Sequence, residues 1–424
     1  MTADVSFDIT AHYNEFVTAE ATRIDAVLTV TAAPNGPPRE VSVAQVLLID
    51  RSGSMDGARI RAARKAAAAA IAALPDGTLF AVVGGGSDAR NVYPRKGLAT
   101  ADSRTRSAAV RAVRTIEADS GTAMSTWLAE ADRLLRGCGA EIRHAILLTD
   151  GQNTERDGKL ERVLASCRGV FTCDARGVGR GWSVRELRMI AEALDGTADA
   201  LLEPEALAAE FTALTEAAVA RIPGTVTLRL KTPAAVSVVR FGEAWPEARD
   251  LRPGTPTIAA GTTDHPAGPW RTGSRDYELT ATVPPGALDE ERFVARVSVL
   301  YGGNVAAQAM ITAERTVDRV KTAAMDPRVA HYRGQQELAE SIRAGLAAHR
   351  VGDTSTAVAE LGRAVRLATA SGNTEALETL GGLVDVQDAA AGRVRLARAA
   401  SSAAADVAEL RAARSVRAQG KPVN

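Results

Sequence analysis

The chain has 424 residues, with 51 Lys and Arg against 51 Asp and Glu, so its formal net charge is zero. This length is enough for two or three domains with cores of their own, and the balanced charge excludes a global field that would attract nucleic acid or an anionic membrane. Aromatic residues make up only 4% of the chain, and the large alanine content predicts many closely packed helices.

Two features favour a cytoplasmic protein without a membrane partner. No apolar run approaches the length of a membrane span, and residues 1–7 lack the basic region and apolar segment of a secretion signal. The three cysteines, Cys138, Cys167 and Cys173, are odd in number and lack paired metal-ligand spacing. We therefore expect reduced thiols rather than disulfides or a zinc site.

Residues 1–40 contain two expected strands. Val5, Phe7 and Ile9 share one parity, which is typical of a strand with one buried face, and residues 26–30 form a second strand. The Pro- and Gly-rich run 34–38 then ends the pattern. Because two strands cannot bury a core by themselves, they need a partner sheet from elsewhere in the chain.

Residues 41–222 alternate between apolar strands and helices. Strands are expected at 46–49, 79–83, 142–148, 169–175 and 199–202, and helices at 60–74, 103–117, 123–135, 158–167, 183–194 and 204–221. This alternation predicts a doubly wound, Rossmann-like α/β domain with a parallel sheet and right-handed crossovers. Ligands of such sheets bind at the carboxyl ends of the strands.

Polar residues follow the ends of these strands. Asp50, Ser52 and Ser54 come directly after the first apolar run, Thr122 lies in a loop of small residues, and Asp150 follows the strand at 142–148. A strand that ends in Asp before a Ser/Gly turn is also typical of a plain helix N-cap. Carboxylate and hydroxyl oxygens that converge on one point, however, suit Mg²⁺ or Mn²⁺ rather than zinc or copper.

These residues resemble the metal-ion-dependent adhesion site of the von Willebrand factor A (VWA) family, which is written Asp-x-Ser-x-Ser, then Thr, then Asp. The matching positions are Asp50, Ser52, Ser54, Thr122 and Asp150. The resemblance implies that the serines bind the metal directly, the threonine directly or through water, and the aspartates largely through water and hydrogen bonds. A partner protein's Asp or Glu then completes the coordination. The segments 142–150, 171–179 and 326–332 also look like those of uncharacterised actinobacterial VWA proteins over the full length.

Residues 223–320 have an all-β pattern. Alternating strands are expected at 225–230, 236–239, 277–283 and 293–300, separated by Pro- and Gly-rich turns. This pattern favours a β-sandwich. We expect the strands of residues 1–40 to complete it, so that the VWA segment 41–222 is inserted in or joined to the sandwich.

Residues 326–398 are expected to form a C-terminal helical domain. Gly352-Asp353 separates two helical patterns that resemble one tetratricopeptide-type pair. A solenoid needs about three repeats, so a small helical bundle is the better prediction. The tail 399–424 is rich in Ala and Arg, and we expect it to fray and to solubilise rather than to bind nucleic acid.

The function predicted from these features is a cytoplasmic, metal-dependent protein–protein interaction module, a scaffold or adaptor that binds a partner carboxylate through Mg²⁺ (or Mn²⁺). We predict no enzyme, because His144 lies well before the end of its strand and Ser52 and Ser54 lack a Gly-x-Ser-x-Gly elbow. The alternative is an accessory subunit of a separate AAA+ ATPase, as in MoxR-like and chelatase-like systems. No Walker motif occurs in this sequence, so that ATPase would be another polypeptide.

Overall fold

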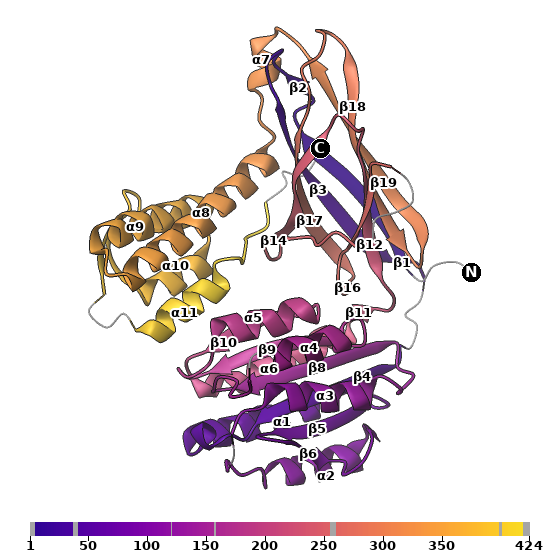
Figure 1. The fold of residues 1–424 in the computed structure, drawn as a ribbon, viewed down its shortest axis with the longest axis vertical. Helices are drawn as coiled ribbons and strands as arrows, with labels where there is room; N and C mark the ends of the chain where they lie inside the picture. The colour runs from indigo at the N-terminus through magenta and orange to yellow at the C-terminus, as the bar shows by residue number, and fades with distance from the viewer. Residues whose placement is uncertain are drawn as a thin grey trace. The chain divides into compact units, whose positions relative to one another are not determined.

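The computed structural model describes residues 5–36, 41–119, 121–156, 158–254, 260–397 and 401–418. They form two compact units (Figure 1). Unit 1 comprises the described residues of 1–39, 224–401 and 411–424, and unit 2 those of 40–223 and 402–410. The chain therefore passes from one unit to the other four times, at 39/40, 223/224, 401/402 and 410/411.

Unit 2 is built on a mostly parallel sheet. In order of pairing, its strands are β10 (Ala198–Leu201), β9 (Thr172–Val178), β8 (Ile142–Thr149), β4 (Val43–Asp50), β5 (Leu79–Gly85) and β6 (Ala89–Tyr93), and the short β7 (Ala99–Thr100) also pairs with β5. Every residue of the central strand β4 is buried. This is expected of a parallel strand that helices cover on both faces.

Helices lie on both faces of this sheet (Figure 1). One face carries α3 (Met124–Leu135), α4 (Lys159–Cys167) and α5 (Val184–Ala193), and the other carries α1 (Ala58–Ala73), α2 (Ser103–Val113) and α6 (Leu207–Val219). Strand β4 serves both cores because its side chains alternate. Val46 lies in one core with Trp127 of α3, and Leu47 lies in the other with Phe211 of α6.

The predicted α/β architecture of this unit is confirmed, with differences at its edges. The sequence does not predict β6 and β7, which run antiparallel to β5. The helix expected at 103–117 ends at Val113, and the one expected at 204–221 begins as a 3₁₀ turn, η2 (Pro204–Ala206), before α6. A second 3₁₀ turn, η1 (Gly53–Met55), follows β4, and the short β11 (Arg221–Ile222) follows α6.

Unit 1 contains two five-stranded sheets. The first has the order β1 (Val5–Tyr13), β3 (Arg23–Pro34), β17 (Gly273–Thr282), β13 (Ser237–Trp245) and β14 (Arg249–Asp250). The second has the order β15 (Thr262–Pro266), β12 (Val226–Lys231), β18 (Glu291–Tyr301), β19 (Asn304–Arg315) and β2 (Phe16–Val17). The short β16 (Trp270–Arg271) precedes β17. Strand β3 pairs with β17, and β2 pairs with β19. Each sheet therefore combines strands that precede residues 40–223 of unit 2 in the sequence with strands that follow them.

Apolar side chains of these two sheets meet. Val5, Phe7 and Ile9 of β1 are buried, and Ser6 and Asp8 between them are exposed, as their parity predicts. The ring of Phe7 lies 5.3 Å from that of Tyr301 on β18, in the other sheet.

The C-terminal part of unit 1 is mainly helical, with α7 (Arg319–Ala323), α8 (Pro327–Arg350), α9 (Thr354–Ser371) and α10 (Thr374–Gly381). Helices α8 and α9 correspond to the pair expected within 326–398. The expectation of a wholly helical segment is wrong, because β20 (Val384–Asp388) and β21 (Arg393–Leu396) pair as an antiparallel hairpin.

The expectation that the tail 399–424 frays is also wrong for part of its length. Residues Ser402–Arg411 form α11, whose Val407 and Leu410 belong to a core cluster of unit 2. Ala403, Ala405 and Ala408 are buried as well. Alanine has high helix propensity and is small enough to bury easily, so an Ala-rich segment can pack where an exposed tail is expected.

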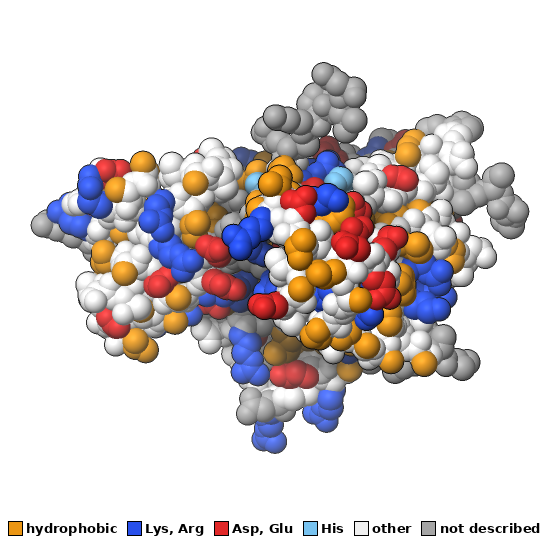
Figure 2. Space-filling view, turned by 90° about the horizontal axis from the view of Figure 1, so that it is seen from above, with side chains coloured by type: hydrophobic (Ala, Val, Ile, Leu, Met, Phe, Trp, Pro, Cys, Tyr) orange, Lys and Arg blue, Asp and Glu red, His pale blue; other side chains and the backbone are white. Residues whose placement is uncertain are grey.

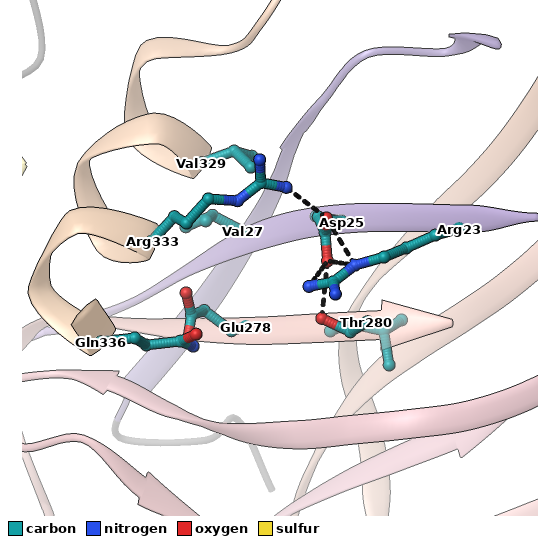
Figure 3. A pocket seen from close by; sticks show the side chains of 10 residues that line it. Arg23, Asp25, Val27, Glu278, Thr280, Val329, Arg333 and Gln336 are labelled. Atoms are coloured by element: carbon teal, nitrogen blue, oxygen red, sulfur yellow. Dashed lines mark hydrogen bonds and ion pairs between the residues drawn. The ribbon is translucent and has the colours of Figure 1, made fainter. Parts of the chain in front are cut away.

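Polar side chains join α8 to the first sheet of unit 1 (Figure 3). Tyr332 Oη donates a hydrogen bond to Asp276 Oδ2 at 2.5 Å, and Arg333 Nη2 donates one to Asp25 Oδ2 at 2.7 Å. Gln336 Nε2 donates to Glu278. These contacts fix α8 along β3 and β17, and the residues of the last two contacts line a small polar pocket between them.

Figure 2 shows Lys and Arg side chains interspersed with Asp and Glu on the face that it presents, in keeping with the balanced composition. Within the described ranges, no helix combines the length and the apolar character needed to span a bilayer.

Candidate metal centre

The candidate centre lies at the carboxyl ends of the neighbouring parallel strands β4 and β8. Ile49 pairs with Leu148 in this register, so Asp50 and Asp150 follow at the same edge of the sheet. Both carboxylates are buried, with 0% and 1% of the residue exposed. Charged groups at such depth need partners, and the surrounding loops supply them.

The Asp50 carboxylate holds its own loop and the neighbouring strand. Its Oδ1 accepts a hydrogen bond from the Ser52 backbone N–H at 2.7 Å, and its Oδ2 accepts one from Thr149 Oγ1 at 2.6 Å. Burial raises the pKa of this carboxyl, and the hydrogen bonds from Thr149 and Ser52 oppose the rise. Asp50 therefore ties the Ser52–Ser54 loop to the end of β8.

The two serines of this loop face Asp150. Ser54 Oγ donates to Asp150 Oδ1 at 2.7 Å, and Ser52 Oγ lies 3.0 Å from Ser54 Oγ. Hydrogen bonds thus connect Asp50, Ser52, Ser54 and Asp150, with Asp50 linked through the Ser52 backbone N–H.

Thr122 reaches the same point from another loop. Its carbonyl oxygen accepts hydrogen bonds from the backbone N–H and the hydroxyl of Thr154, at 2.8 and 2.7 Å. The N–H of Ala123 donates to Gly86 O at 2.9 Å. These bonds hold the threonine loop between the ends of β5 and β8.

Gly151 shows where the hydroxyls converge. A Cβ atom built on this glycine would lie 3.2 Å from Thr122 Oγ1, 3.5 Å from Ser54 Oγ and 3.9 Å from Ser52 Oγ. The absence of a side chain at this position therefore leaves a small space surrounded by three hydroxyl oxygens. Hydroxyl and carboxylate donors are the hard oxygen ligands that Mg²⁺ and Mn²⁺ prefer, so the residues present fit such an ion.

This donor set differs from a carboxylate or histidine cluster. Among the described residues, no group of three or more His, Cys, Asp or Glu could hold a metal. The set at Gly151 instead combines the carboxylates of Asp50 and Asp150 with the hydroxyls of Ser52, Ser54 and Thr122.

Two arginines that the sequence analysis does not single out complete the surroundings. The side chain of Arg51 is 6% exposed and pairs with Asp88 at 2.7 Å and with Asp119, and the Asp119 N–H donates to Arg51 O at 3.0 Å. Arg51 thereby anchors the start of the threonine loop. Arg59, in the first turn of α1, pairs with Asp150 at 2.7 Å. In the sequence, these contacts are indicated only by the presence of Arg51 within the Asp-x-Ser-x-Ser motif and of Arg59 shortly after it.

His144 does not belong to this centre. It pairs with Gln45 along the sheet, away from the carboxyl end of β4. Its Nε2 lies 2.7 Å from Asp174 Oδ2, and burial lowers the pKa of its imidazole. His144 is therefore a buried histidine held by Asp174.

A family model for the von Willebrand factor type A domain matches residues 44–200. A solved von Willebrand factor type A protein from Catenulispora acidiphila is 36% identical, with 98% of each chain covered and a TM-score of 0.89. The ArnB paralogue VWA2 from Sulfolobus acidocaldarius covers 97% of this chain and 98% of its own with a TM-score of 0.56, and its 15% identity indicates a shared fold alone.

Among curated sequences, an uncharacterised protein from Synechocystis sp. is 26% identical over 182 residues, and the chain spans only 42% of that relative's length. A doubly wound sheet that carries Asp-x-Ser-x-Ser, Thr and Asp at one edge is the arrangement expected of a VWA-type α/β domain. The chain belongs to the von Willebrand factor type A family, as its sequence motifs predict.

Proposed function

We propose that unit 2 binds a divalent cation, Mg²⁺ or Mn²⁺, and uses it to bind a carboxylate of a partner protein. The observation that carries the proposal is the space at Gly151, around which the hydroxyls of Ser52, Ser54 and Thr122 converge. In this proposal the three hydroxyls and the two carboxylates, Asp50 and Asp150, hold the ion.

The neutral character of the hydroxyl ligands is central to this proposal. Ser52, Ser54 and Thr122 donate lone pairs without adding charge, while Asp50 is engaged by Ser52 N–H and Thr149. When bound, the ion supplies an under-neutralised coordination position that favours an incoming Asp or Glu. The loops around it position that side chain, and burial of Asp50 and Asp150 keeps their charges from being screened by water.

A binding role is favoured over catalysis. Hydrolysis would need a general base within hydrogen-bond reach of the reacting group. His144 is buried and faces Asp174, away from the hydroxyls. We propose the same binding role for the whole chain. In this proposal the two sheets of unit 1 form a β-sandwich, and α8–α10 form a small helical bundle. The accessory role to a separate AAA+ ATPase remains the alternative, and the partner screen below discriminates between them.

The test is a calorimetric titration of Mg²⁺ and Mn²⁺ into EDTA-stripped full chain, with thermal melts of the same samples. Wild type should show saturable binding and a metal-dependent rise in melting temperature. Asp50→Ala should lose both, whereas Asp56→Ala, which removes an exposed carboxylate from the same loop, should keep both. Absence of binding by a folded wild type would contradict the metal proposal.

If binding is found, a pull-down with and without chelator identifies the class of partner. A partner that is lost on chelation and in Asp50→Ala supports carboxylate recognition. Co-purification of an ATPase supports the alternative.

A further inference from the structure

Arg59 occupies a defined position at the edge of the hydroxyl cluster. Its Nη1 donates a hydrogen bond to Asp150 Oδ2 at 2.7 Å and another to the Ser54 carbonyl oxygen at 2.8 Å. The same aspartate accepts from Ser54 Oγ through its other oxygen, Oδ1. One guanidinium group therefore contacts both the carboxylate and the loop that form the candidate centre.

The neighbouring chain leaves room for this side chain. Gly179 follows β9 with a φ of +72°, and a Cβ atom built there would lie 3.1 Å from Arg59 Nε. A residue with a side chain would be strained at this φ and would crowd the guanidinium. The loop at Gly179 therefore helps to position the Arg59 side chain against Asp150, together with α1 and the Ser52–Ser54 loop.

The charges explain why the contact matters. The Asp150 side chain is 0% exposed, whereas that of Arg59 is 39% exposed. A buried carboxylate without a positive partner is strongly destabilising, so Arg59 stabilises Asp150 when no other cation does. A divalent ion among the hydroxyls would draw on the same carboxylate and would repel the nearby guanidinium.

We propose that Arg59 is a built-in counter-ion that competes with the divalent cation for Asp150 and thereby weakens metal binding. This inference rests on the proposed metal site. Arg59 and the metal ion compete for the Asp150 carboxylate, so their effects on each other are reciprocal. Metal binding weakens the Arg59–Asp150 ion pair by the same factor by which the ion pair weakens metal binding. Arg59 is a regulating residue, since the five residues Asp50, Ser52, Ser54, Thr122 and Asp150 hold the ion in the proposed site.

The experiment measures Mn²⁺ affinity by calorimetry in EDTA-stripped full chain for wild type, Arg59→Ala, Arg59→Lys and Arg61→Ala. Arg61 is an exposed arginine on the same helix, so its substitution removes the same charge at a distance from Asp150. Arg59→Ala should bind Mn²⁺ more tightly, on the order of tenfold. Arg61→Ala should match wild type, and Arg59→Lys, which keeps the charge, should restore binding toward the wild-type value.

A second readout separates competition from a purely structural role. Without metal, Arg59→Ala should melt below wild type because Asp150 loses its partner, and saturating Mn²⁺ should narrow that difference. A residue that only supports the fold would weaken metal binding when removed, the reverse of this expectation.

The outcomes distinguish the two proposals. Binding by wild type with equal or weaker binding by Arg59→Ala overturns the role of Arg59 and leaves the metal site standing. No binding by any of these variants overturns both.

Discussion

At the scale of single residues, Gly151 is the position on which the candidate centre depends most. A Cβ atom built on it would lie among three hydroxyl oxygens, so the methyl group of an alanine would compete with an ion for that space. We predict that Gly151→Ala folds with little loss of stability but no longer shows a Mn²⁺-dependent rise in melting temperature. Gly137→Ala is the control, because a Cβ there meets nothing within 4 Å. A normal Mn²⁺ response in Gly151→Ala would show that the ion does not use this space.

The clustering of the candidate metal ligands at one edge could be predicted from the sequence, whereas the arginines around them could not. Asp50 ends β4, Asp150 directly follows β8, and Ser52, Ser54 and Thr122 lie in the connections after strands. Parallel topology brings these positions to one edge. Their role in binding metal stays a prediction. Arg51 and Arg59 carry long flexible side chains that normally point to solvent. Whether such a side chain turns inward depends on which acidic groups the fold places near it, and local sequence does not contain that information.

At the scale of elements, the crossing of α8 and α9 depends on a close approach. A Cβ on Gly345 of α8 would lie 2.7 Å from Leu361 Cγ of α9, so the helices are nearer there than an alanine permits. Gly345→Ala should lower the free energy of unfolding by about 1–3 kcal/mol, the usual cost of overpacking.

Gly334 gives the matched control on the same helix. A Cβ there meets nothing within 4 Å, so Gly334→Ala should raise the free energy of unfolding by roughly 0.5–1 kcal/mol through helix propensity. Urea denaturation of both variants measures the difference. Equal effects of the two substitutions would contradict the close crossing.

The polar contact of α8 with β3 should depend on pH. Burial acts to raise the pKa of Asp25, but hydrogen bonds from Arg23, Thr280 and Arg333 outweigh it and leave the pKa below its ordinary value. A carboxyl with a lowered folded pKa stabilises the fold above its unfolded pKa of about 3.9, and this stabilisation is lost as the pH falls through the folded pKa.

Asp25→Asn should therefore destabilise the fold at pH 7 by about 1 kcal/mol, a small value because Arg23 and Arg333 are partly exposed. The difference from wild type should shrink as the pH falls below about 4. Thermal melts between pH 7 and pH 3 test this, with the exposed Asp8→Asn on β1 as the control. A difference that stays constant over this range would contradict the assignment to Asp25.

Elements with a strong pattern could be predicted, and those held mainly by their neighbours could not. The buried run of β4 and the amphipathic helices of unit 2 follow from their apolar spacing. The strands β6, β7 and β14 are short edge strands with little apolar pattern, and β19 alternates mostly small or polar residues over its exposed half. Pairing with β5, β13 and β18 determines these strands, and pairing partners are not visible in a local window.

At the scale of the whole molecule, the two strands in residues 1–40 need a partner sheet from elsewhere in the chain. This need predicts that the segment 41–222 is inserted between strands of one β-domain. The pairing of β3 with β17 and of β2 with β19 supports it. Helix α11 belongs to unit 2, although the segments before and after it in the sequence belong to unit 1. No pattern in the sequence predicts this assignment. The alanines of α11 give helix propensity but do not specify which core the helix joins.

The split sheet of unit 1 also has a consequence for synthesis. Strand β3 ends at Pro34 and its partner β17 begins at Gly273, 239 residues later. At about 5–20 residues per second, a ribosome needs roughly 12–50 s to make that stretch. Unit 2 acquires its consecutive strands during this interval, while the edge of β3 that later pairs with β17 still lacks its partner. The nascent chain therefore exposes an open β-edge until β17 has been made, and an open edge of this kind is a template for pairing with another chain.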